Sequence, residues 1–168
     1  MKQKLNFFFK RAIILSSILI LITTLFTGCG ANPKNFTFED MTITLTDDFV
    51  VEEAPGFKIY LESDDVLFSA IEEDFDSLEH SGYEIDSLND YCIEILQLNN
   101  ASSETLTQRE DYYYFTNTGT VSGANYTYVH CMMKGNSSYW VCEFVCKTKH
   151  YKRLKDKIFN WADSIEIK

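Results

Sequence analysis

The chain has 168 residues, of which 15 are basic and 25 acidic, so its formal charge at pH 7 is −10. This charge argues against a nucleic-acid binder that works by neutralising phosphates. With 45% hydrophobic and 15% aromatic residues, the composition excludes intrinsic disorder for most of the chain, and the length corresponds to one modest domain.

The first 28 residues have the layout of a secretory signal. A basic start is followed by an uncharged run of 16 residues, 12–27, which is shorter than the roughly 20 residues that a membrane-spanning helix needs. The run ends in FTGC, residues 26–29, which resembles a bacterial lipobox, where the cysteine thiol receives a diacylglyceryl group and becomes the first residue of the mature protein. The alternative is ordinary cleavage near Cys29 and release as a secreted protein.

The lipobox predicts a lipoprotein signal peptide over residues 1–28, lipid attachment at Cys29 and a location on the outer face of the bacterial plasma membrane. Several acyl chains make a durable anchor because each buried methylene contributes about 0.8 kcal/mol. Residues 29–35 contain Gly, Asn and Pro without apolar periodicity, which predicts a flexible linker. The folded domain is therefore expected over residues 36–168.

Short β-favouring runs and acidic turns follow the linker and predict strands over residues 41–45, 57–61 and 66–71. The period changes at Ser87, which is expected to cap a helix that ends at Asn99 and lays Cys92 against a sheet. Further strands are expected near residues 105–110, 112–117, 125–134 and 139–147. A final helix is predicted from an apolar stripe of Tyr151, Leu154, Ile158, Trp161 and Ile165.

Two predicted strands, YTYVHCMM and YWVCEFVC, carry bulky residues on both faces, so both faces of their sheet must be covered. Helices before and after the strands can supply these covers, which predicts an α/β/α sandwich of the α+β class with a mainly antiparallel sheet. The opening FTFEDMTITLTDDF, the acidic run over residues 66–75, the helix introduced by SLNDY, the aromatic hairpin across GNSS and the final WADSIEIK resemble the PsbP-like sandwich superfamily. DcrB-like proteins and uncharacterised lipoproteins of Gram-positive bacteria belong to it. The resemblance covers residues 36–168 and implies the fold, but no site residue, because the members share no single activity.

Four cysteines remain after Cys29: Cys92, Cys131, Cys142 and Cys146. Cys142 and Cys146 lie on one face of a strand about 13 Å apart, which is too far for a disulfide. A four-residue loop at GNSS pairs Cys131 with Cys142, whereas a two-residue loop pairs it with Trp140. The cysteines can be free thiols in the core or form one disulfide, and the sequence leaves both interpretations open. If all four cysteines pair, three disulfide connectivities are possible. No CxxC pair occurs, and the histidines are not spaced near the cysteines in a zinc-ligand pattern, so no zinc site is indicated.

Charge is unevenly distributed along the chain. Between Glu39 and Asp111 there are 21 acidic residues and two basic ones, whereas 8 basic and 4 acidic residues follow from Tyr112 onward. The acidic part offers hard oxygen ligands for calcium but lacks EF-hand spacing, and solvated turns explain it more simply. No metal site is assigned. The weak candidate ligands are Glu62, Asp64, Asp65, Glu72, Glu73, Asp74 and Asp76.

Two further patterns each have a functional and a structural interpretation. Basic residues of the final helix, residues 147–157, either rest on anionic lipid head groups or form a solvated face above a buried apolar stripe, and the second interpretation is favoured. The aromatic residues 112–115 and those of the last two strands either form a stacking platform for wall glycan or fill the core. The core is again favoured because both faces of the sheet are covered.

No GxSxG, HExxH or Gly-rich phosphate loop occurs, and carboxylate pairs are too abundant to indicate a glycosidase. The sequence therefore predicts no enzymatic activity, no catalytic residue and no cofactor. The predicted function is a lipid-anchored, non-catalytic cell-surface binding or interaction module. Its expected partners are the membrane, through Cys29, and an envelope or surface protein, with no nucleic acid. The alternative is an ion- or small-ligand-binding accessory protein of an envelope transporter.

Overall fold

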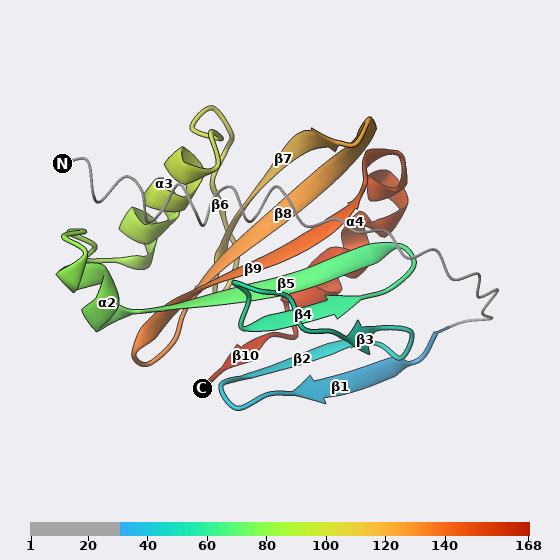
Figure 1. The fold of residues 1–168 in the computed structure, drawn as a ribbon, viewed down its shortest axis with the longest axis horizontal. Coiled ribbons are helices and arrows are strands. Elements are labelled where there is room, and N and C mark those ends of the chain that lie inside the picture. The colour runs from blue at the N-terminus through green and yellow to red at the C-terminus, as the bar shows by residue number, and fades with distance from the viewer. Residues whose placement is uncertain (1–30) are drawn as a thin grey trace.

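A large antiparallel sheet forms the centre of the structure, a computed structural model that describes residues 31–168 (Figure 1). Cys29 and the predicted signal peptide lie outside the described residues. The sheet has the spatial order β3-β4-β5-β9-β8-β7-β6. Its strands are β3 (Val50–Val51), β4 (Ile59–Glu62), β5 (Val66–Asp74), β6 (Thr107–Gln108), β7 (Tyr113–Val121), β8 (Ala124–Lys134) and β9 (Ser138–Lys147).

Both faces of this sheet are covered, as predicted from the bulky residues on both sides of its strands. Helices α2 (Phe75–His80) and α3 (Leu88–Leu98) pack on one face. Helix α4 (Thr148–Ala162) packs on the other, next to a three-stranded antiparallel sheet of β1 (Pro33–Thr37), β2 (Met41–Thr46) and β10 (Glu166–Ile167). The predicted α+β sandwich with a mainly antiparallel sheet is confirmed, and the small sheet is an additional part of its second cover (Figure 1).

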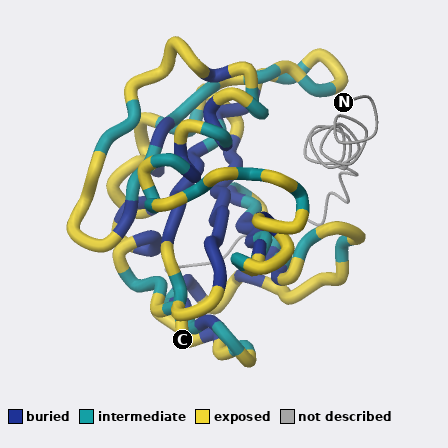
Figure 2. Tube along the Cα trace, turned by 90° about the vertical axis from the view of Figure 1, so that its left-hand side faces the viewer, coloured by how far each residue is buried: buried dark blue, intermediate teal, exposed yellow. Residues whose placement is uncertain are grey.

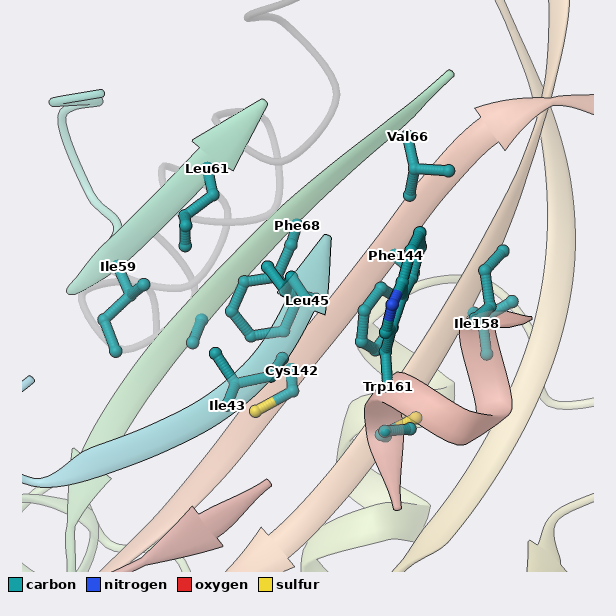
Figure 3. Packing of buried hydrophobic residues seen from close by; sticks show 14 of the residues in the cluster. Ile43, Leu45, Ile59, Leu61, Val66, Phe68, Cys142, Phe144, Ile158 and Trp161 are labelled. Atoms are coloured by element: carbon teal, nitrogen blue, oxygen red, sulfur yellow. The ribbon is translucent and has the colours of Figure 1, made fainter. Parts of the chain in front are cut away.

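The larger core lies between the large sheet and the layer of α4 and β2. Phe68 and Phe144 contact each other at 4.9 Å between ring centroids, and Phe49 meets the edge of Trp161 at 5.2 Å. Figure 3 shows residues from both layers interdigitating here. Ile158 and Trp161 are buried in this core, so the apolar stripe of the last helix is structural and its basic residues face outward. Buried residues accordingly gather along the middle of the molecule (Figure 2).

The smaller core lies beneath α2 and α3. Ser87 caps α3 by accepting a hydrogen bond from the Asp90 amide at 3.2 Å, as the sequence predicted. Tyr91 of α3 stacks on Tyr139 of β9 with 4.6 Å between centroids. Cys92 is fully buried against the sheet. The aromatic side chains of both cores are therefore packing residues, which is the interpretation that covered sheet faces favour.

Several boundaries differ from the sequence predictions: for example, β5 extends to Asp74 beyond the predicted residues 66–71, and three further differences have a clear physical reason. β1 begins at Pro33, inside the segment predicted as a linker, because its backbone pairs with β2 and Asn32 bonds the Asp47 side chain. α4 ends at Ala162, so Ile165 packs against the core from the connection to β10 and not from the helix. β7 continues to Val121, because Ser122 and Gly123 adopt positive φ and form a tight two-residue turn.

Candidate binding cleft

The acidic residues considered as metal ligands have separate roles in the structure. Glu72 pairs with Lys58 at 2.9 Å, and Asp74 caps α2 through the Ser77 amide at 3.0 Å. Glu73 accepts a hydrogen bond from the Tyr91 hydroxyl. The Asp65 carboxylate lies 3.3 Å from His150 Nδ1 and 3.0 Å from a guanidinium nitrogen of Arg153. Glu62, Asp64 and Asp76 lie at the end of β4, in the following turn and in the first turn of α2. Within residues 31–168, no three His, Cys, Asp or Glu side chains converge on a common metal position.

The four cysteines of the described domain are buried free thiols. Cys131 of β8 lies directly opposite Cys142 of β9, which is the register that a four-residue GNSS loop requires. Burial raises the pKa of the Cys92 thiol to about 12 and that of Cys146 to about 11, and it raises the pKa of Cys131 as well. These thiols are therefore protonated and poorly nucleophilic near neutral pH.

A surface cleft of about 560 Å³ lies where the segment before β7 approaches the end of α4 and β10. This volume is within the range of about 300 to 1,000 Å³ that is usual for ligand sites. Its apolar lining comes from Tyr112, Met133, Ala162, Ile165 and Ile167, and its charged lining from Arg109, Glu110, Asp111, Lys134, Asp163 and Glu166.

A small network holds one wall of the cleft in place. Asp163 follows the last residue of α4 and accepts a 2.7 Å hydrogen bond from the Arg109 guanidinium and a 2.8 Å hydrogen bond from the Tyr112 hydroxyl. The Arg109 guanidinium also lies 5.0 Å from the centroid of the Phe159 ring. Burial, more than the contact with Asp163, raises the pKa of Tyr112 far above its usual value, so its hydroxyl remains a hydrogen-bond donor.

The charges of the cleft are not balanced. Arg109 is neutralised by Asp163, and the Lys134 ammonium lies over the rings of Phe75 and Tyr139, 5.5 and 5.8 Å from their centroids. Glu110 and Asp111 are exposed, and neither side chain has a hydrogen bond or ion pair to another residue of the described domain. The wall therefore keeps two carboxylates available for a ligand.

A second polar feature lies on the large sheet, on the face that α3 covers in part. Ser69 of β5, Glu143 of β9 and His130 of β8 occupy directly paired positions, and all three are buried. His130 Nδ1 is 3.0 Å from a Glu143 carboxylate oxygen, and Nε2 is 3.2 Å from the Asn117 side-chain oxygen. Burying a carboxylate next to an imidazole costs folding free energy unless each group compensates the other. Substitutions in this row are therefore expected to change the stability of the domain strongly.

Sequence reasoning did not identify either feature. Arg109 and Asp163 are 54 positions apart, and no local pattern connects them. For the polar row a signal was present, because Glu143 interrupts the apolar run YWVCEFVC and His130 similarly interrupts YTYVHCMM. A charged residue inside a strand buried on both faces requires a partner on a neighbouring strand.

Comparisons with known proteins bear on the fold. No family model matches the chain, and no curated protein matches its sequence. The solution structure of cyanobacterial PsbP (CyanoP) from Synechocystis sp. PCC 6803 is similar with a TM-score of 0.50 and 10% identity, over 88% of this chain and 99% of that one. The Ran-binding protein Mog1p of Saccharomyces cerevisiae is similar with a TM-score of 0.52 and 8% identity, over 82% of this chain and 96% of that one.

The described part of the chain contains no helix of the length and apolarity that crossing a bilayer requires. Its layered architecture and its likeness to the two solved structures indicate the same fold. The chain has the PsbP-like α+β sandwich fold.

Proposed function

We propose that the chain is a non-catalytic binding module, anchored by a lipid at Cys29 to the outer face of the bacterial plasma membrane, and that it holds an envelope protein at the cleft. The lipobox-like segment FTGC supports the anchor. The cleft carries the binding part of the proposal, because it joins an apolar lining to Glu110 and Asp111, two carboxylates without a partner in the described domain.

The chemistry of the lining favours binding over catalysis. The cleft is lined by no His, Cys, Ser or Thr side chain, and Arg109 and Tyr112 are both engaged with Asp163. A nucleophile activated by a neighbouring base is therefore not assembled there. Mog1p, which shares the fold, is described as a Ran-binding protein, so a sandwich of this type is compatible with a function in binding another protein.

The anchor is tested by intact mass spectrometry of the membrane fraction. We expect the wild-type chain to have the mass of residues 29–168 plus acyl chains, and we expect the Cys29→Ala variant to lack this species. A wild-type mass without lipid contradicts the anchor and leaves a secreted binding protein in its place.

The binding site is tested by photo-crosslinking in intact cells. A photoreactive residue at Glu110 is expected to form one discrete adduct, whereas the same residue at Ile93, which is exposed on α3, is expected to form none. Equal adducts at both positions, or none at either, contradict a specific site at the cleft. The ion-binding alternative is less favoured, because the predicted metal ligands do not converge within residues 31–168.

A further inference from the structure

The backbone of β10 has one free edge. β10 pairs only with β2 in the small sheet, with Glu166 opposite Thr42 and Ile167 opposite Met41. The Lys168 amide donates to the Asp40 carbonyl at 3.0 Å. In an antiparallel pair, hydrogen-bonded positions alternate with positions that are not bonded. Lys168 and Glu166 therefore direct their backbone groups toward β2.

The same alternation directs the amide and carbonyl of Ile167 away from β2. The partner strand agrees with this, because the Met41 carbonyl accepts a hydrogen bond from Phe38 on the side of β1. Ile165, Glu166 and Ile167 all line the cleft. The cleft is thus lined, in addition to its apolar side chains, by a strand whose Ile167 N–H and C=O have no partner strand in the described domain.

The charges at this edge favour a cation. Glu110 and Asp111 have no partner in the described domain, and the Glu166 carboxylate makes one long contact, 3.4 Å, with the Thr42 hydroxyl. Both cationic groups of the lining, Arg109 and Lys134, are engaged with other groups of the protein. An added strand would meet three exposed carboxylates and, among the cations of the lining, only the Lys134 ammonium without a carboxylate partner in the described domain.

We propose that the cleft binds a short extended segment of a partner protein, in which basic residues alternate with apolar ones, by adding it as a strand to the edge of β10. Side chains of a strand point alternately to opposite sides, so apolar residues face Met133 and Ile165 while basic residues face Glu110 and Asp111. Backbone pairing supplies affinity, and alternate side chains supply selectivity. This inference rests on the proposed binding function and specifies the partner's chemistry.

The test uses the full chain in mild detergent and a fluorescent acetyl-Lys-Val-Lys-Val-Lys amide peptide, with anisotropy as the readout. We expect saturable binding that weakens at least fivefold in the Glu110→Gln/Asp111→Asn variant. The Glu79→Gln/Glu104→Gln variant removes the same charge from exposed residues outside the cleft and is expected to change the affinity less than twofold. Urea midpoints of both variants verify that folding is unchanged.

A second peptide tests the strand pairing. N-methylation of the backbone amides of the two Val residues removes donors without changing charge, and we expect it to weaken binding at least fivefold. Binding should also slow hydrogen exchange of the Ile167 amide. Equal affinity for the methylated peptide or for spermine would show general attraction of polycations and overturn the proposal.

The two proposals fail in different ways. If the Lys-Val peptide does not bind at millimolar concentration while the adduct at Glu110 forms in cells, the peptide class is wrong and the binding function stands. If neither the peptide nor the adduct is found, both proposals are overturned.

Discussion

His130 and Glu143 face each other on the two central strands β8 and β9, with Nδ1 of the imidazole 3.0 Å from a carboxylate oxygen and both side chains more than nine-tenths buried. Nδ1 makes no aligned hydrogen bond to this oxygen. The imidazole also stacks on Phe115, with 4.4 Å between ring centroids. Because both groups are buried and in contact across β8 and β9, substitution of either one is expected to destabilise the domain.

Removing one member of this pair is expected to be more damaging than removing both. The His130→Leu variant leaves the Glu143 carboxylate buried without its imidazole partner, and we expect a loss of about 3–5 kcal/mol in the free energy of unfolding. The double variant His130→Leu/Glu143→Leu should lose less. Urea unfolding measures both, and Glu104→Leu at an exposed position serves as control with an effect within about 0.5 kcal/mol. Additive losses would show that the two side chains are not coupled.

The stability of the domain is expected to fall in alkaline solution. Burial raises the pKa of Cys92 to about 12 and that of Cys146 to about 11, whereas a thiol in the unfolded chain titrates near about 8.5. Above that pH the unfolded chain releases protons that the folded chain keeps, so unfolding becomes more favourable as pH rises. Each such thiol contributes a slope of up to about 1.4 kcal/mol per pH unit.

Urea unfolding at pH 7.5, 9 and 10 measures this slope. The Cys146→Ala variant removes one contributing group, so its stability should decline less steeply between pH 9 and 10 even if it is lower at every pH. An unchanged slope in this variant would show that the thiol of Cys146 is accessible and titrates alike in both states.

Alkylation is expected to separate the folded from the unfolded chain. The four thiols Cys92, Cys131, Cys142 and Cys146 are at most 3% exposed, and iodoacetamide reacts with thiolates. At pH 8 we expect no modification of these residues in native protein and modification of all four in 6 M guanidinium, as mapped by peptide mass spectrometry. Failure of Cys131 and Cys142 to react in the denatured, unreduced chain would instead reveal a disulfide across β8 and β9.

Gly135 fixes the distance between the β8–β9 turn and β10. A Cβ at this position would lie 2.9 Å from Ile167 Cγ2 and 3.3 Å from Ser138 Oγ. We expect Gly135→Ala to cost about 1–3 kcal/mol and to accelerate hydrogen exchange of the Lys168 amide, which bonds the Asp40 carbonyl. In an Ile167→Ala background the same substitution should cost less, because the closest atom is gone. A cost independent of Ile167 contradicts this explanation.

The central strands and the two longer helices were predictable because their signals are local. Long apolar runs mark β8 and β9, Ser87 marks the start of α3, and the apolar stripe marks α4. The short elements α2, β3 and β10 were not predicted, because two to six residues contain too little pattern. β10 also exists only through β2, since Glu166 pairs with Thr42, 124 positions away.

The candidate site was less predictable than the fold. A cleft formed by the segment around Arg109 and the end of α4 requires knowledge of how the sheet places them together, and the acidic composition masked Glu110 and Asp111 among 25 carboxylates. The predicted linker failed for a related reason: residues 33–35 look irregular, and only their pairing with β2 makes them a strand. Lipid attachment at Cys29 remains a prediction.

Both edges of the large sheet end in strands of two residues, β3 and β6. β6 pairs with only Tyr113 and Tyr114 of the nine residues of β7, so the outer edge of β7 has no neighbouring strand of the described domain further along its length. For the proposed membrane-anchored domain, whose copies would meet far more often than they do in free solution, this open edge offers backbone groups to a second chain.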